Sequence, residues 1–328
     1  MNRFTALLSA AVLLLPGVSS AQSGPQGEER TWAVVEFSSN YLRHSPDYES
    51  GLDTQTLMGA VTEVLDSDRY WRKVSTPDPY VGWVNERGLT YMTEAEKDAY
   101  IEAPKWICIA EVTHIFEEPD ASSARICDFI MGDLVRKTGE CRRGWTLVML
   151  PSGTTGWVRS HEIADFYQWA STRVLSEESV VALAKTFLGT PYLWGGDTVK
   201  GFDCSGLVKM TYMMHGVLTM RDADQQMRTG VEVPYDFDQM RPGDLVFFGT
   251  PATDSAPAKA AHVAIYIGGG RIIHASQNVH ILSLVKGEPD YYKRIEERPV
   301  IAVRRLIGHV DTGEGVVSIL KNPWYFKQ

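Results

Sequence analysis

The sequence predicts a multidomain protein in which two small β-barrels precede a larger α+β domain. Three observations support this prediction. The N-terminal half contains an internal repeat of short strand-like segments, a helical pattern begins near residue 175, and alternating apolar strands follow it. A length of 328 residues also exceeds what one compact core usually holds, which favours two or three domains.

Residues 1–21 have the features of a secretory signal peptide. Arg3 precedes an apolar run from Ala6 to Leu15, and small residues follow before Ala21. The run is much shorter than the roughly 20 residues of a membrane-spanning helix, and no Cys follows the cleavage site to carry a lipid. We therefore expect an exported protein, periplasmic or extracellular, without a membrane span.

The composition is that of an ordinary globular protein, with 44% hydrophobic and 22% charged residues. The formal net charge of −9 disfavours binding to nucleic acid. We expect no cofactor and a monomeric chain. In an oxidising compartment Cys108, Cys127 and Cys141 could supply one disulfide, whose pairing stays open, whereas Cys204 stands apart.

The internal repeat rests on five landmarks that recur in order, displaced by 73 or 74 positions. They are Trp32 and Trp106, Pro46-Asp47 and Pro119-Asp120, Met58-Gly59 and Met131-Gly132, Trp71 and Trp145, and Gly82-Trp83-Val84 and Gly156-Trp157-Val158. A common register over several landmarks indicates duplication. Short apolar segments between turn residues are typical of small β-barrels. We expect one barrel within residues 22–98 and a second within residues 104–168.

The third domain begins with a predicted helix. Ser176 is a favourable N-cap and is followed by two acidic residues, and an apolar face then runs to Phe187 before Gly189 ends the helix. Before it, the charged segment 93–103 is predicted to be a linker with some helical character. We expect the third domain to span residues 175–307, followed by a C-terminal extension at residues 308–328.

Cys204 is the candidate nucleophile. The apolar segment that follows it and ends at Gly216 predicts a helix with Cys204 in its first turn. The unpaired N–H groups and the dipole at a helix N-terminus favour an anion, so we expect the pKa of the Cys204 thiol to be lowered.

A predicted β-hairpin supplies the partners of the nucleophile. His262 and His274 lie twelve residues apart around a run of glycines, and this spacing places both on one face of the hairpin if the loop has an odd number of residues and no bulge. A thiol nucleophile needs a base and a third group that orients the base. We assign His262 as the base and His274 as the orienting residue. The spacing lacks the paired short intervals of a zinc site, so no metal is expected.

These motifs identify a resemblance to a known family. The third domain resembles the NlpC-type cysteine peptidases, which have a papain-like fold, and each repeat copy resembles a bacterial SH3-like domain that ends in a Gly-Trp-Val strand. The motifs are Pro191-Tyr192-Leu193-Trp194-Gly195-Gly196, Asp203-Cys204-Ser205-Gly206, Pro242-Gly243-Asp244-Leu245, and His262 with His274. The resemblance implies hydrolysis of the bond between the γ-carboxyl of D-glutamate and an L-linked diamino acid in peptidoglycan peptides.

The domain order is similar to that of γ-D-glutamyl-L-diamino acid endopeptidases with two SH3-like domains. These act on short peptides with a free N-terminal L-alanine. This resemblance implies that Tyr192 lies beside the nucleophile and that Arg221, in the pair Arg221-Asp222, lies close to the substrate. It also implies that an acidic residue and a tyrosine of the first barrel hold the amine together with the residues around the nucleophile. The candidates for this amine site are Tyr80, Glu49, Asp203 and Ser205.

Several alternatives remain open. The substrate could be polymeric, crosslinked wall rather than free peptide, and the diamino acid could be diaminopimelate or lysine. A protein of another class would be a wall-binding adaptor with an inactive peptidase domain, but the intact Cys204, His262 and His274 argue against it. An acyl-transfer enzyme on the same scaffold is disfavoured by the domain order.

Overall fold

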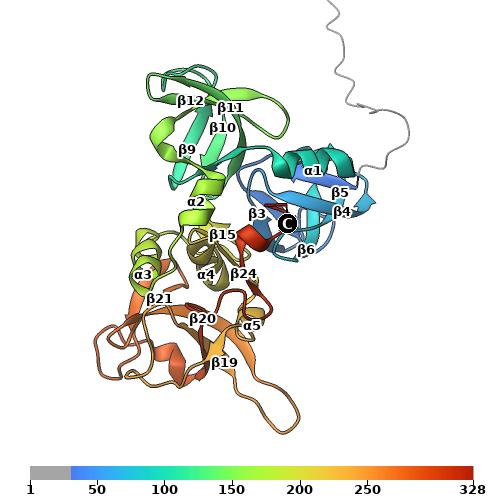
Figure 1. The fold of residues 1–328 in the computed structure, drawn as a ribbon. Helices are drawn as coiled ribbons and strands as arrows, with labels where there is room; N and C mark the ends of the chain where they lie inside the picture. Colours follow the sequence, from blue (N-terminus) through green and yellow to red (C-terminus); the bar gives the residue numbers. More distant parts are fainter. Residues whose placement is uncertain (1–30, 328) are drawn as a thin grey trace, which may run out of the picture.

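The computed structural model describes residues 31–327, so the signal peptide expected at residues 1–21 lies outside the described part. Figure 1 shows two β-barrels and a larger α+β domain that contacts both. The predicted fold class, two SH3-like β-barrels followed by an α+β papain-like domain, is confirmed. Among the described residues, no helix is long and apolar enough to cross a membrane.

The first barrel is a seven-stranded antiparallel sheet with the order β3-β2-β6-β5-β4-β1-β7. Its elements are β1 (Trp32–Val35), β2 (Asn40–Arg43), β3 (Leu52–Thr56), β4 (Val61–Asp68), β5 (Trp71–Ser75), β6 (Val81–Asn85), η1 (Glu86–Gly88) and β7 (Leu89–Met92). Ala33, Val35, Leu42, Val74 and Val84 lie inside the barrel and form its core.

The second barrel repeats this topology strand for strand. Its order is β10-β9-β13-β12-β11-β8-β14, which is the order of the first barrel with seven added to every strand number. Its elements are β8 (Lys105–Cys108), β9 (Val112–Phe116), β10 (Arg125–Ile130), β11 (Leu134–Arg142), β12 (Trp145–Met149), β13 (Thr155–Arg159), η2 (Ser160–Glu162) and β14 (Ile163–Asp165). The identical strand order supports the duplication inferred from sequence.

The two barrels contact each other where Met58-Gly59 of the first barrel meets Leu134 of the second. The backbone N–H of Leu134 donates to the carbonyl oxygen of Met58 at 2.9 Å. Gly59 has a φ of +82°, and a Cβ atom at this position would lie only 2.3 Å from the Leu134 carbonyl oxygen. Glycine is therefore required where the backbones meet. Between the barrels runs helix α1 (Glu94–Glu102), whose N-terminus is closed by a capping box between Thr93 and Glu96.

The α+β domain is built on a six-stranded antiparallel sheet with the order β18-β23-β19-β20-β21-β22. The strands are β18 (Val231–Glu232), β19 (Leu245–Thr250), β20 (Lys259–Gly268), β21 (Arg271–Ala275), β22 (Val279–Ser283) and β23 (Val300–Arg305). Two short pairs lie outside this sheet, β15 (Asp197–Thr198) with β16 (Gly201–Phe202) and β17 (Val217–Thr219) with β24 (Val316–Ser318). The helices are α2 (Phe166–Thr172), α3 (Glu177–Thr186), α4 (Cys204–Met213), α5 (Ala223–Gln226), η3 (Lys293–Glu296) and η4 (Ile319–Lys321).

Both faces of the central sheet are buried. Along β19, Leu245 and Phe247 belong to the larger core, which also contains residues of α3 and α4, whereas Val246 and Phe248 belong to a smaller core on the opposite face. This alternation follows from the period of two residues in a strand. Helix α4 packs against β20 and β21, and its N-terminus carries Cys204.

The segment expected as a C-terminal extension is integrated into the fold. Its strand β24 pairs with β17, and the Trp324 ring then packs edge-on against Trp32 of the first barrel at 5.3 Å between ring centroids. Phe326 stacks on Phe166, which follows the second barrel, at 4.8 Å. The chain end therefore contacts the first barrel and helix α2, and Figure 1 shows it next to the first barrel.

Candidate active site

Cys204 is the first residue of α4, as the sequence predicted. The preceding residue, Asp203, is the N-cap, and its Oδ1 accepts a hydrogen bond from the N–H of Gly206 at 2.7 Å. Gly206 is needed here because a Cβ atom would lie 2.1 Å from the carbonyl oxygen of Gly196. The Asp-Cys-Ser-Gly motif thus caps the helix and lets the Gly195-Gly196 segment approach its first turn.

The expected lowering of the Cys204 pKa is wrong. Burial raises the pKa of the thiol to about 11, and the negative charge of Asp203 adds to this effect. Hydrogen bonds from the backbone N–H groups of Val263 and Ser205 act in the opposite direction but are outweighed. A protonated thiol needs a base during attack, so the role of the neighbouring histidine becomes more important.

His262 on β20 and His274 on β21 are in direct contact. The Nε2 atom of His262 lies 2.7 Å from Nδ1 of His274, and the ring centroids are 4.9 Å apart in an edge-on arrangement. The pairing of Ile265 with Ile273 puts both histidines on one face of the hairpin, although a bulge lies near its turn. Burial lowers the pKa of His262 to about 4, so the imidazole is neutral at neutral pH.

His274 is surrounded by the side chains of other aromatic residues and is not exposed to solvent. Its side chain is fully buried, and its ring lies 4.5 Å from His280 and 5.1 Å from the Tyr292 ring. Burial lowers the pKa of His274 even further than that of His262, because each nearby histidine would add an unfavourable charge. His274 is therefore neutral and can accept or donate one hydrogen bond to His262, depending on its tautomer.

Cys204 and His262 line a cleft of about 810 Å³. Its walls come from both the α+β domain and the first barrel. The lining residues are Asp53, Tyr80, Tyr192, Trp194, Asp203, Cys204, Ser205, Asp222, Ala223, Asp224, Thr250, Lys259, Ala260, Ala261, His262, Ala275, Ser276, Tyr292, Arg294 and Arg298. A concave site that combines a thiol, a neutral imidazole and charged groups has the features of a hydrolytic centre.

Arg221 lies behind the cleft wall and is not among the lining residues. Its guanidinium is 1% exposed, forms an ion pair with Asp203 and donates to Ser205 Oγ at 2.9 Å. Its Nε donates to Thr54 Oγ1 of the first barrel, also at 2.9 Å. Arg221 thus neutralises Asp203 and fixes it to the barrel. Because Asp203 also accepts bonds from the protein backbone, little of its charge remains for a ligand.

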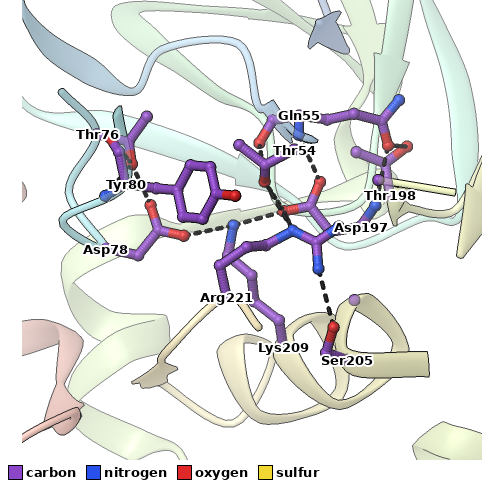
Figure 2. Close-up of polar contacts among 12 residues, drawn as sticks. Thr54, Gln55, Thr76, Asp78, Tyr80, Asp197, Thr198, Ser205, Lys209 and Arg221 are labelled. Atoms are coloured by element: carbon purple, nitrogen blue, oxygen red, sulfur yellow. Dashed lines mark hydrogen bonds and ion pairs between the residues drawn. The ribbon is translucent and has the colours of Figure 1, made fainter. Parts of the chain in front are cut away.

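The first barrel is held against the α+β domain by a buried polar network (Figure 2). Asp197 accepts a hydrogen bond from the backbone N–H of Gln55 at 3.1 Å, and the Gln55 side-chain oxygen accepts one from the backbone of Asp197 at 2.9 Å. Lys209 of α4 lies between Asp197 and Asp78 of the barrel and forms ion pairs with both. This network positions Asp53 and Tyr80, the barrel residues that line the cleft.

The remaining predicted site residues divide into two groups. Tyr192 lies in the cleft, where burial raises its pKa and the charge of a Cys204 thiolate would raise it further. Tyr80 also lines the cleft, whereas Glu49 lies in an exposed loop and is not part of the wall. Asp53, at the start of β3, provides the carboxylate for which Glu49 was the candidate.

Sequence reasoning missed several lining residues. Asp53 had a detectable signal, because the 73-residue displacement of the flanking repeat landmarks makes Ile126 its equivalent in the second copy, and the strand pairings agree. A carboxylate in one copy and an isoleucine in the other indicates a specialised role. The other missed residues had no local signal and are brought to the cleft by tertiary packing. They are Tyr292, Arg294, Arg298 and Lys259.

All four cysteines have free thiols in the structure, so none of the possible bridges among Cys108, Cys127 and Cys141 is formed. Cys108 is buried in the core of the second barrel, where it packs as an apolar residue. Within residues 31–327, no group of three or more His, Cys, Asp or Glu side chains could hold a metal ion.

Comparison with known proteins follows the same division of the chain. The NlpC/P60 family matches residues 189–296, and the bacterial dipeptidyl-peptidase SH3 domain matches residues 42–89. A γ-D-glutamyl-L-lysine dipeptidyl-peptidase of Bacillus cereus is 31% identical over 245 residues, which cover 71% of each chain. Dipeptidyl-peptidase 6 of Lysinibacillus sphaericus is 27% identical over 76% of this chain and 90% of its own.

The fold agrees with this assignment. The crystal structure of an NlpC/P60 family protein from Bacillus cereus superposes with a TM-score of 0.70 at 26% identity, covering 84% of this chain and 99% of that chain. The similarity therefore includes the barrels as well as the α+β domain. From the sequence identity, the matched domains and the shared fold, the protein belongs to the NlpC/P60 family of cysteine peptidases.

Proposed function

We propose that this protein hydrolyses the γ-D-glutamyl-L-diamino acid bond of short peptidoglycan peptides that carry a free N-terminal L-alanine. The observation that carries the proposal is the position of Asp53 and Tyr80. Both belong to the first barrel, yet both line the cleft that contains Cys204. A peptide whose acyl part extends from Cys204 toward the barrel would place its N-terminus beside these two residues.

The electrostatics of this end of the cleft support recognition of an ammonium group. The pKa of Tyr80 is raised to about 12 by burial and by the negative charges of Asp222 and Asp53. A potential that disfavours a phenolate favours a bound cation. Asp203 contributes less because Arg221 neutralises it. We therefore assign the amine site to Asp53, Tyr80 and Asp222, with Asp203 and Ser205 as the wall between this site and the nucleophile.

The proposed reaction uses the thiol and the two histidines. Cys204 attacks the γ-carbonyl carbon of D-glutamate while Nδ1 of His262 takes the thiol proton, and a tetrahedral intermediate forms. His262 then returns this proton to the amine of the diamino acid, which leaves, and the dipeptide remains bound to Cys204 as a thioester. Water, deprotonated by His262, attacks the thioester and releases L-Ala-D-Glu and the thiol.

The proposed function also leads to expectations for the cellular location and the oligomeric state of the enzyme. Export, as expected from residues 1–21, would place the enzyme on the side of the cytoplasmic membrane where the peptidoglycan wall lies. We propose a periplasmic or extracellular enzyme that acts as a monomer, because one chain supplies the nucleophile, the base and the amine site.

Polymeric wall is the rival substrate. A murein DD-endopeptidase of Escherichia coli, whose name indicates action on the wall itself, is 32% identical over 33% of this chain. In this protein the first barrel stands at the amine end of the cleft, where a stem peptide would continue into its glycan strand. We therefore favour free peptides.

The test compares kcat/KM for three substrates with the same stem: the free peptide L-Ala-γ-D-Glu-diaminopimelate, its N-acetylated form, and the muropeptide. Acetylation removes the charge with little change in size. We expect the free peptide to be cleaved at least about tenfold better than the acetylated one, the value of one charge-assisted hydrogen bond. Similar kcat/KM values for all three would reject the amine site and favour the remodelling of polymeric wall.

A further inference from the structure

Four charged side chains of the cleft are segregated by sign. Around Tyr80 the strongest charge effects come from Asp222 and Asp53, both negative. Around His262 the strongest come from Arg294 and Arg298, both positive. All four charged side chains line the same cleft. These four residues therefore place a pair of negative charges beside Tyr80 and a pair of positive charges beside His262.

The two arginines are held on one short turn. Arg294 belongs to η3, and the backbone N–H of Arg298 donates to the carbonyl oxygen of Arg294 at 2.8 Å. Both side chains line the cleft, so the turn presents the two guanidiniums to the same space. The turn is anchored by Tyr292, whose buried ring packs edge-on against Phe248 at 5.2 Å and against His274 at 5.1 Å.

Neither guanidinium has an ion-pair partner within the described residues. Other arginines of the same domain do, since Arg305 pairs with Asp244 and Arg271 pairs with Asp290. Glu296, which lies between Arg294 and Arg298 in sequence, pairs with Lys286 instead. Two exposed guanidiniums that share a cleft with the nucleophile and have no internal carboxylate are available to bind an anion.

The position of this pair relative to the reaction identifies the anion. In the proposed function the acyl part of the substrate extends from Cys204 toward the acidic end, so the leaving residue extends toward the basic end. We propose that Arg294 and Arg298 bind the side-chain carboxylate of the leaving residue and thereby select diaminopimelate over lysine. This inference rests on the proposed function and adds the substrate class at the leaving side.

The chemistry of the two diamino acids explains the selection. Diaminopimelate ends in a carbon that bears both an amino group and a carboxylate, and guanidiniums bind carboxylates through paired hydrogen bonds. Lysine ends in an ammonium group alone, which two neighbouring guanidiniums repel. The α-carboxylate is common to both residues and therefore cannot discriminate between them.

The experiment uses the full chain and four tripeptides that begin with L-Ala-γ-D-Glu. They end in diaminopimelate, in lysine, in diaminopimelate amidated on the side-chain carboxylate, and in diaminopimelate amidated on the α-carboxylate. We expect kcat/KM for the first to exceed that for the lysine peptide and the side-chain amide by about tenfold, the typical effect of one charged hydrogen bond. The α-amide should resemble the first.

The double variant Arg294→Gln, Arg298→Gln should lose this preference through a higher KM for the diaminopimelate peptide. The acid limb of its kcat/KM profile should also move to higher pH, because both charges depress the pKa of His262. Arg87→Gln, an exposed arginine outside the cleft, is the matched control and should behave as wild type.

The outcomes separate the two proposals. Equal cleavage of all four peptides by the wild type would overturn the inference and leave the proposed function standing, as would a loss confined to the α-amide. An unchanged preference in the double variant would also overturn the inference. Cleavage of none of the four would reject the proposed function, and the inference with it.

Discussion

The Nε2 atom of His262 lies 2.7 Å from Nδ1 of His274, and this contact determines which nitrogen of His262 can act as a base. If Nε2 of His262 donates to His274, Nδ1 of His262 keeps its lone pair and can accept the thiol proton. His274 must then carry its own proton on Nε2, an atom that is buried and has no hydrogen-bond partner among the described residues. The tautomer that serves catalysis therefore leaves one buried N–H group unpaired, at a cost of about 1–3 kcal/mol.

We predict that His262→Ala lowers kcat by about 10²–10⁴-fold, the typical contribution of general acid–base catalysis. His274→Ala should cost less, because His274 orients the base and does not exchange a proton with the substrate. Steady-state kinetics on the free peptide measure both effects. The matched variant His274→Asn keeps a side-chain acceptor for Nε2 of His262 and should retain more activity than His274→Leu. Equal activity of the Asn and Leu variants would contradict an orienting hydrogen bond.

The pH dependence of kcat/KM follows from two pKa values. His262 must be neutral to accept a proton, and its pKa is lowered to about 4, so activity is lost as the pH falls through this value. The Cys204 thiol must be protonated before it attacks, because it transfers this proton to His262. Its pKa is raised to about 11, so the thiol is protonated across neutral pH. We therefore predict a broad plateau across neutral pH, with an acid limb near 4. A narrow bell centred between pH 6 and 8 would show that a thiolate–imidazolium pair is the active form.

The rate of alkylation tests the raised pKa of the Cys204 thiol independently of the pH profile. Because only the thiolate reacts, and burial raises the pKa of Cys204 to about 11, the rate of inactivation by iodoacetamide should rise about tenfold per pH unit between pH 7 and 9. Cys204→Ala should abolish hydrolysis and leave the thermal unfolding midpoint nearly unchanged. A rate that is already high at pH 6 and flat above it would indicate a lowered pKa, and turnover after complete alkylation of Cys204 would exclude it as the nucleophile.

The parts of the site that sequence could predict are those encoded locally. The Asp203-Cys204 pair before an apolar run predicted the helix start, and twelve residues around a glycine turn predicted that His262 and His274 share a face. The pKa of Cys204 could not be predicted in the same way. A helix N-terminus lowers it, but burial by the surrounding domain raises it more, and burial depends on the whole fold.

The residues that sequence did not reveal come from contacts between distant segments. Asp53 is about 150 positions from Cys204 and reaches the cleft only because Gln55 and Asp197 hold the first barrel in place. Likewise, residues 308–328 follow the last predicted motif, yet β24 completes a strand pair and Trp324 packs on Trp32. Pairings of this kind leave no periodicity in either segment, so they emerge only in three dimensions.

The buried network at the barrel interface leads to a prediction about stability. Lys209 forms ion pairs with Asp78 and Asp197, and all three side chains are largely buried. We predict that Lys209→Ala destabilises the protein by about 3–5 kcal/mol, because two buried carboxylates lose their counter-charge. Chemical unfolding monitored by tryptophan fluorescence measures this change. The control Lys286→Ala removes an exposed ion pair with Glu296 and should change stability by less than about 1 kcal/mol. Equal effects of the two variants would contradict a structural role for the network.

The amine site offers the sharpest test of how the first barrel contributes to specificity. Asp53 lies at the start of β3 with its side chain partly exposed to the cleft, and its internal partner is His44, at 3.5 Å, which is a cation only when protonated. The His44 side chain is 83% exposed, so solvent screens this contact and the Asp53 carboxylate can also bind an ammonium group. We predict that Asp53→Asn lowers kcat/KM for the free peptide by about tenfold, the loss expected for one charge-assisted hydrogen bond.

The same variant should leave kcat/KM for the N-acetylated peptide almost unchanged, because that peptide has no charge to lose. Glu49→Gln is the matched control, since Glu49 lies on the same barrel but outside the cleft, and it should leave both substrates unaffected. Tyr80→Phe should follow Asp53→Asn to a smaller extent, because it removes a neutral hydrogen-bonding group rather than a charge. If Asp53→Asn reduced the cleavage of the free and acetylated peptides by the same factor, Asp53 would act on the cleft as a whole, through the docking of the barrel. The amine would then have to be recognised by Asp222.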